Sequence, residues 1–192
     1  MRAAVASRAP HARKHGTTFA ETWTSADGAT IVAVGAVLAG ADPVVVSDLL
    51  RTGARALVTS RRALAIALGA LDRVVRKHAD EHRDDLLAAA VVLLAFAKDG
   101  TEVDYAGAGQ LHAALIDGAG AQRGLHGRAG ALGTGIEPLD PIEQLHLRRD
   151  DLVVVATIPL DRAWWASGDR TPEALLHQSG AHEASAALVE LS

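Results

Sequence analysis

Two histidines one helical turn apart are the clearest chemical signal in the first half of the chain. The sequence His78-Ala-Asp-Glu81-His82 places both imidazoles on one face of a helix, with a carboxylate beside them. That spacing suits zinc, although a zinc site also needs a third ligand in a defined context. Because the motif stands in a strongly charged stretch, we favour the alternative of a solvated helix end, where histidine lies near the negative end of the helix dipole.

Other patterns that carry catalysis or nucleotide binding are weak in this sequence. The clusters Gly107-Ala-Gly109 and Gly118-Ala-Gly120 look like nucleotide-binding loops, but no helical pattern follows them, so we interpret both as turns. The sequence does not decide whether folding brings Ser, His and Asp side chains together into a catalytic arrangement. No Gly-x-Ser-x-Gly nucleophile elbow occurs. The chain has no cysteine, which excludes disulfide and thiolate chemistry.

Length and composition indicate one globular domain over residues 1–192. Apolar residues make up 49% of the chain and aromatic residues only 3%, so the core must consist mainly of alanine, valine and leucine. A net charge of −4 gives no reason to expect nucleic acid as a partner. The longest apolar stretch, Leu86–Ala97, is too short to span a membrane. We therefore expect a soluble cytoplasmic protein that does not associate with membranes.

The second half of the chain reads as a series of short strands. Turns rich in glycine or proline separate four apolar runs, which are Val103–Tyr105, Leu111–Ile116, Gln144–Leu147 and Leu152–Ala156. Because glycine and proline interrupt the chain while β-branched residues fill the runs, we predict consecutive antiparallel strands. Further on, Thr171-Pro172 begins a short capped helix, and the run Ser185–Leu191 forms a last strand.

The first half combines a hairpin with two helices. The apolar runs Phe19–Trp23 and Ala29–Val37 flank Asp27-Gly28, which is a strong hairpin signal. Apolar residues at helical spacing then predict one helix from Asp42 to about Val58 and a second from about Ser60 to His78. We expect both helices to pack on one face of a sheet.

Three further interpretations concern this half of the chain. The polar face of the second helix, on which Asp72 lies with Arg73 and Arg76, should face water. The run Leu87–Ala97 fits either an alanine-rich helix or a buried strand. The basic segment 1–15 reads as either a loose arm or a first strand.

Sequence motifs in the second half of the chain resemble those of a known family. Tyr105-Ala-Gly-Ala-Gly-Gln110 precedes an apolar strand, and Gly133-Thr-Gly135 and the run Leu147–Thr157 follow it. Together these resemble the metal-dependent PPM-type (PP2C-like) serine/threonine phosphatases, in particular their SpoIIE/RsbU/RsbX-like branch. The resemblance spans about residues 5–191. It implies an α+β fold, an α/β/β/α sandwich of two mostly antiparallel sheets flanked by helices, with strands at 87–97 and near the N-terminus.

The resemblance also locates the metal site of the family, and there this chain departs from the pattern. Family members hold two Mg²⁺ or Mn²⁺ ions with carboxylates, since hard cations prefer charged oxygen ligands. The matching positions here are Thr18, Ala36, Ile158 and Ala184. None of these side chains supplies a charged oxygen. We therefore expect no catalytic residues, no bound metal and no cofactor.

Three neighbouring acids are candidate substitutes for the missing ligands. They are Glu21, Asp161 and Glu183, each displaced along the chain from a ligand position. A shift of one residue along a strand turns a side chain to the other face, which argues against substitution. If these acids did bind Mn²⁺ or Mg²⁺, the chain would be an active, divergent phosphatase that dephosphorylates a phosphoserine regulator.

The resemblance implies a regulatory role in bacterial signalling, of the partner-switching and stress-response type. The first hypothesis is a pseudophosphatase that binds a protein, such as a STAS-type anti-sigma antagonist or an anti-sigma kinase, and that forms a homodimer. A structural or oligomerisation module is a further alternative. The pair Trp164-Trp165 is either an exposed contact for a partner or a cover for the edge of the core.

Overall fold

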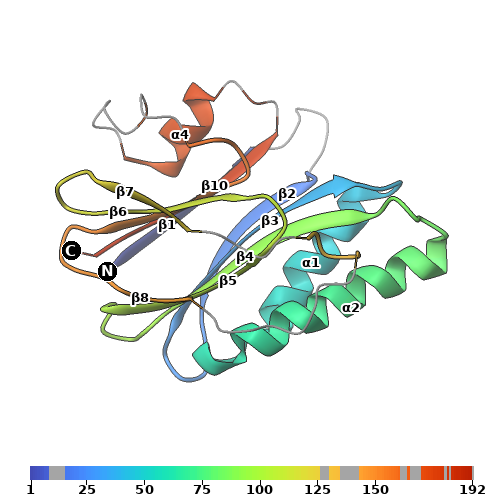
Figure 1. The fold of residues 1–192 in the computed structure, drawn as a ribbon, viewed down its shortest axis with the longest axis horizontal. Coiled ribbons are helices and arrows are strands. Elements are labelled where there is room, and N and C mark those ends of the chain that lie inside the picture. Colours follow the sequence, from blue (N-terminus) through green and yellow to red (C-terminus); the bar gives the residue numbers. More distant parts are fainter. Residues whose placement is uncertain are drawn as a thin grey trace.

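The protein consists of two five-stranded antiparallel sheets that pack face to face (Figure 1). The computed structural model describes residues 1–8, 16–125, 130–134, 143–160, 164, 170–179, 181 and 183–191. Sheet A has the order β1 (Arg2–Arg8), β10 (Ala184–Glu190), β9 (Leu152–Ala156), β6 (His112–Ile116), β7 (Gln122–Leu125). Sheet B has the order β2 (Thr18–Thr24), β3 (Thr30–Ala39), β4 (Ala88–Phe96), β5 (Glu102–Ala108), β8 (Glu143–His146).

Helices cover the outer faces of both sheets. Helix α1 (Pro43–Leu57), the short 3₁₀ helix η1 (Arg61–Ala63) and α2 (Leu64–His82) follow one another along the chain. The two long helices pack on sheet B, and α4 (Pro172–Gln178) lies on sheet A (Figure 1). A third apolar layer, with Val92, Tyr105 and Val155, fills the space between the sheets. This arrangement confirms the predicted α/β/β/α fold.

The predictions for the strands of the first half are confirmed. Strands β2 and β3 form the expected hairpin, and Gly28 adopts a φ of +81° in its turn. The ambiguous run at 87–97 is a strand, β4, which pairs with both β3 and β5. Residues 2–8 of the basic N-terminal segment form strand β1, paired with β10, whereas residues 9–15 lie outside the described part of the chain.

The four runs of the second half are strands, but neighbours in sequence do not all pair. Strands β5 and β8 belong to sheet B, whereas β6 and β9 belong to sheet A. The chain changes sheet just after β5, at Gly109. Its φ is +81°, and a Cβ there would lie 2.5 Å from that of Ala90. A backbone this close to a neighbouring strand explains the glycine.

Two predictions about α2 are wrong, and one strand was not predicted. The helix runs from Leu64 to His82, later than expected at both ends. Asp72 is buried instead of facing water. Its carboxylate accepts a hydrogen bond from the amide of Gly133 (2.9 Å) and pairs with Arg76 (2.9 Å).

The strand that was not predicted is β7. It is mostly polar and lacks the apolar alternation that indicates a strand. No helix among the described residues is long and apolar enough to cross a bilayer.

Candidate functional site

Two of the four predicted ligand positions lie side by side on neighbouring strands. Thr18 on β2 and Ala36 on β3 are direct partners in the antiparallel register. Residues directly opposite one another point to the same face of a sheet. Ala20, two residues beyond Thr18, packs in the layer between the sheets, so this pair belongs to the inter-sheet face. A metal site on this face would require these two positions to lie side by side, and they do.

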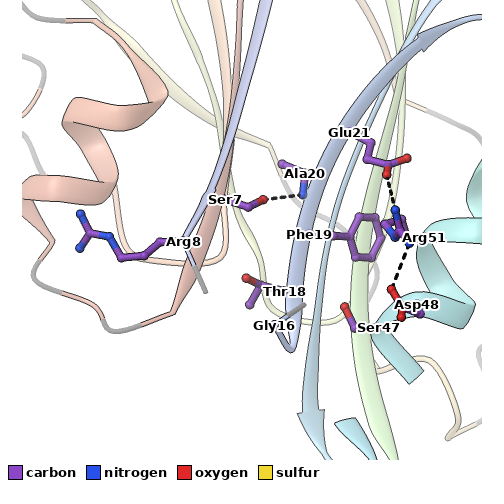
Figure 2. A pocket seen from close by; sticks show the side chains of 10 residues that line it. All are labelled: Ser7, Arg8, Gly16, Thr18, Phe19, Ala20, Glu21, Ser47, Asp48 and Arg51. Carbon is purple, nitrogen blue, oxygen red and sulfur yellow. Dashed lines mark hydrogen bonds and ion pairs between the residues drawn. The ribbon is translucent and has the colours of Figure 1, made fainter. Parts of the chain in front are cut away.

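A chain of hydroxyl groups occupies the space beside Thr18. The Thr18 hydroxyl is hydrogen-bonded to that of Ser185 on β10 (2.9 Å), and Ser185 donates to Ser7 on β1 (2.8 Å). Ser7 in turn accepts a hydrogen bond from the backbone amide of Ala20 (3.1 Å; Figure 2). Ser185 is fully buried, so these hydrogen bonds replace its contacts with water. Neutral hydroxyls therefore join the two sheets here.

One carboxylate does reach this place, that of Glu183. Its Oε1 accepts hydrogen bonds from the backbone amides of Thr17 and Thr18, the second at 3.1 Å. A side chain at position 16 would overlap this carboxylate, so Glu183 would have to shift if Gly16 were replaced. In this structure Glu183 serves to hold the start of β2.

Ala184, another predicted ligand position, does not face Thr18. Its side chain is buried in the apolar cluster between sheet A and α4, and it points away from Thr18. Ile158 lies in the same cluster. The residue of β10 that meets Thr18 is the next one, Ser185. Strand alternation reveals this only once one residue of β10 has been assigned to a face, which the sequence alone does not do.

Glu21, a candidate substitute, is separated from Thr18 by the sheet itself. It shares the outer face of β2 with Phe19, which packs beneath the helices. Its carboxylate pairs with Arg51 of α1 (3.0 Å; Figure 2) and approaches Arg55 (3.9 Å). The hydrogen bond that Arg51 donates to this carboxylate raises the pKa of Arg51. Asp161, the third candidate, lies outside the described residues.

A pocket of about 220 Å³ opens around the start of β2 (Figure 2). Its lining contains two basic side chains, Arg8 and Arg51, and two acidic ones, Glu21 and Asp48. Arg51 is paired with both acids, at 3.0 Å to Glu21 and 3.2 Å to Asp48. Among the described residues of the lining, the charges are thus largely balanced.

These residues do not fit the pair of divalent cations that the sequence resemblance implies. Among the described residues, no three His, Asp or Glu side chains converge in a way that would hold a metal ion. The carboxylate of Glu183, which lies beside Thr18, is engaged with backbone amides. A hydroxyl and a methyl group at positions 18 and 36 supply no negative charge.

The two remaining sequence signals are the tryptophan pair and the His78–His82 motif. Trp164 is 1% exposed and packs in the apolar cluster with α4, which agrees with the alternative that it covers the edge of the core. Trp165 lies outside the described residues. His78 and His82 stack with ring centroids 4.1 Å apart at the exposed end of α2, and His82 Nδ1 lies 2.9 Å from the carbonyl oxygen of His78.

Solved structures of bacterial phosphatases share this fold. The S. agalactiae serine/threonine phosphatase is 11% identical, with a TM-score of 0.79 over 100% of this chain and 99% of that one. RsbX in complex with magnesium is 12% identical, with a TM-score of 0.75 over 98% and 94%. The RsbU and RsbW domains of Rv1364c from Mycobacterium tuberculosis are 20% identical, with a TM-score of 0.74 over 97% of this chain and 60% of that one. Identities this low establish the fold alone.

Sequence comparison assigns the family. No curated protein matches the chain. A family model described as Stage II sporulation protein E (SpoIIE) matches residues 27–187, from the β2–β3 turn to the middle of β10. The match covers most of the chain and both sheets. The chain therefore belongs to the SpoIIE family of PP2C-type phosphatase domains.

Proposed function

We propose that this domain is a catalytically inactive member of the SpoIIE family that acts by binding a protein partner in bacterial partner-switching signalling. The observation that carries the proposal is the replacement of charge by hydroxyls at the start of β2. Thr18 and Ala36 form a neutral pair, and the Thr18 hydroxyl is bonded to Ser185. The site has become part of the packing between the two sheets.

Electrostatics explains why such a site would lose the metals. Two divalent cations a few ångströms apart repel strongly, and only several carboxylates offset that repulsion. Carboxylates clustered without cations are costly to desolvate, so their replacement by Thr and Ala is favourable once metal binding is lost. Without a metal to lower the pKa of water, the family's hydrolytic nucleophile is missing.

The fold relatives support a protein partner. The description of one solved structure of the same fold names the bacterial stressosome, and another structure contains RsbU and RsbW domains. On this basis, candidate partners are a STAS-type anti-sigma antagonist and an anti-sigma kinase. Binding would shield a phosphoserine or compete with an active phosphatase.

The direct test is calorimetric titration of Mn²⁺ and Mg²⁺ into the purified domain, together with a phosphatase assay on a phosphoserine peptide. The expected result is no measurable heat of binding and no turnover. A SpoIIE-family phosphatase that retains its acids is the positive control. Micromolar metal binding with turnover would contradict the proposal and support a divergent enzyme.

A restored site gives a sharper test. In the double variant Thr18→Asp/Ala36→Asp, two carboxylates would face each other on adjacent strands and lower the stability. We expect Mn²⁺ to raise its melting temperature and to leave the wild type unchanged, because only the variant offers the cation two charged ligands. Thr18→Asn/Ala36→Asn is the matched control without charge. Equal Mn²⁺ shifts in the wild type and the Asp variant would show that the native site still binds metal.

The alternative of an active phosphatase has one observation in its favour, the carboxylate of Glu183 beside Thr18. If Glu183 were a metal ligand, Glu183→Gln would abolish any Mn²⁺-dependent turnover of the wild type. Glu190→Gln, an exposed position on the same strand, is the control. Our proposal expects no turnover in any of the three proteins.

A further inference from the structure

Three large apolar side chains are exposed at one end of the molecule. Leu38 is 50% exposed, Val45 is 49% exposed and Leu86 is 78% exposed. Leu38 lies near the end of β3, Val45 lies in the first turn of α1, and Leu86 lies in the connection from α2 to β4. We call this surface, formed by residues 38–45 and 84–88, the apolar tip.

The two segments that form the apolar tip are in contact. Ala39 is the register partner of Ala88, and the pairing is irregular between Val37 and Ala39, which leaves Leu38 out of register. The backbone amide of Ala41 donates a hydrogen bond to the Asp84 carboxylate (2.7 Å). The end of β3 and the α2–β4 connection lie at the same end of the ribbon (Figure 1). The exposed side chains therefore share one surface, although 48 residues separate Leu38 from Leu86 in sequence.

Acidic residues outnumber basic ones in the segments that carry these apolar groups and in the last turn of α2. The segments 38–45 and 80–88 contain Arg83 as their one basic Lys or Arg residue, and five acids, which are Asp42, Asp80, Glu81, Asp84 and Asp85. Lys77 approaches Glu81 only to 3.7 Å, and both side chains are largely exposed, so this pair neutralises little. The excess of acids here equals the net charge of −4 of the whole chain. A partner that complements this surface must carry positive charge around an apolar face.

The apolar tip adjoins the candidate site. Leu38 follows Ala36 by two residues on β3, and the amide of Val37 donates to the carbonyl of Thr17 (2.9 Å). On α1, Val45 is followed by Ser47 and Asp48, both of which line the pocket. A partner seated on the tip would therefore lie beside the former metal site.

We propose that the apolar tip docks a basic amphipathic segment of a protein partner. The proposal rests on the proposed function in one respect, namely that the domain acts by binding a protein. Leu38, Val45 and Leu86 provide the apolar contact that such a segment buries, and the excess carboxylates of residues 38–45 and 80–88 select a partner rich in Lys or Arg. An acidic partner is disfavoured by the same charges.

The test uses two fluorescein-labelled peptides of about four helical turns, one of Leu and Lys with Leu at helical spacing, the other with Glu in place of Lys. Fluorescence anisotropy with the full chain should show binding of the Leu/Lys peptide that weakens with salt, and no binding of the Leu/Glu peptide. Leu38→Ser/Leu86→Ser should weaken binding at least about tenfold. Glu81→Gln/Asp85→Gln should weaken it and reduce its salt dependence, while Asp84, which anchors Ala41, stays intact.

The control is Ile66→Ser, because Ile66 is 74% exposed on α2 outside the apolar tip. Circular dichroism verifies that each variant is folded. The proposal is overturned if the Leu38/Leu86 variant binds as tightly as the wild type, if Ile66→Ser weakens binding equally, or if neither peptide binds. It is also overturned if sedimentation shows a dimer that the Leu38/Leu86 variant dissociates, since the tip would then belong to a second copy. Metal-dependent turnover with intact peptide binding would instead refute only the proposed inactivity.

Discussion

The hydroxyl groups of Thr18 and Ser185 lie 2.9 Å apart although the residues are 167 positions apart in sequence. This contact joins sheet B to sheet A at the place where the sequence resemblance locates the first metal ligand. At this position a hydrogen bond between two neutral hydroxyl groups stands where the family has a charged metal ligand. Ser185 also donates to Ser7, so three strands are linked through neutral groups.

The first prediction concerns this contact. Thr18→Val keeps the shape of the side chain but removes the hydroxyl that bonds to buried Ser185. We expect a loss of about 1 kcal/mol in the free energy of unfolding, measured by urea denaturation. Thr24→Val, at an exposed position on the same strand, should change it far less. Equal stability of Thr18→Val and the wild type would mean that the hydroxyl contact contributes nothing.

The second prediction concerns Glu183, which accepts from the amides of Thr17 and Thr18. Glu183→Ala should cost about 1–3 kcal/mol, and Glu183→Gln less, because the amide oxygen of Gln still accepts hydrogen bonds. Hydrogen exchange of the two amides should accelerate in the Ala variant. Glu190→Ala, at an exposed position on the same strand, is the control. Unchanged exchange at Thr17 and Thr18 would count against the role assigned to Glu183.

Two glycines should respond to alanine with opposite signs. Gly133 has a φ of +95°, and a Cβ there would meet the Leu87 carbonyl oxygen at 2.8 Å, so Gly133→Ala should destabilise the fold by more than about 1 kcal/mol. Gly69 lies within α2, where a Cβ would find its nearest neighbour, Arg73, at 4.0 Å. Gly69→Ala should therefore stabilise the protein by about 0.5–1 kcal/mol. Melting temperatures that shift in the same direction would contradict this prediction.

The fourth prediction concerns Tyr105, the only tyrosine of the chain. Burial, with a smaller contribution from the charge of Glu143, raises the pKa of Tyr105 to about 12. The unfolded phenol ionises near its ordinary pKa of 10, so the unfolded state releases this proton first as the pH rises. The stability contribution is complete below pH 10 and is lost by about pH 12, at up to about 1.4 kcal/mol per pH unit.

The measurement is the absorbance change of the phenolate with pH, together with urea denaturation at each pH. Tyr105→Phe should remove the absorbance change and flatten the loss of stability between pH 10 and 12. Among the described residues the Tyr105 hydroxyl has no hydrogen-bond partner, so this variant should be at least as stable as the wild type at neutral pH. A native midpoint near pH 10 would mean that the phenol is solvated.

Local patterns in the sequence determined the elements. The Asp27-Gly28 turn, the periodicity of α1 and the Thr171 cap of α4, whose hydroxyl accepts from the amide of Ala174 (3.2 Å), depend on interactions within a few residues. Such signals persist whatever surrounds them, and this is why the predicted strands and helices are found. The neutral residues at positions 18 and 36 were likewise visible without a structure.

Only the tertiary structure decided which of these residues meet. It turned Ser185 rather than Ala184 toward Thr18, brought Glu183 to the amides of β2, and buried Asp72 beneath the amide of Gly133. Each of these contacts joins residues at least about 60 positions apart. Their geometry follows from the pairing register and from the packing of two sheets, and a shift of one residue along a strand would reverse every face. The sequence thus determined the fold and the missing charges, while packing decided what replaced them.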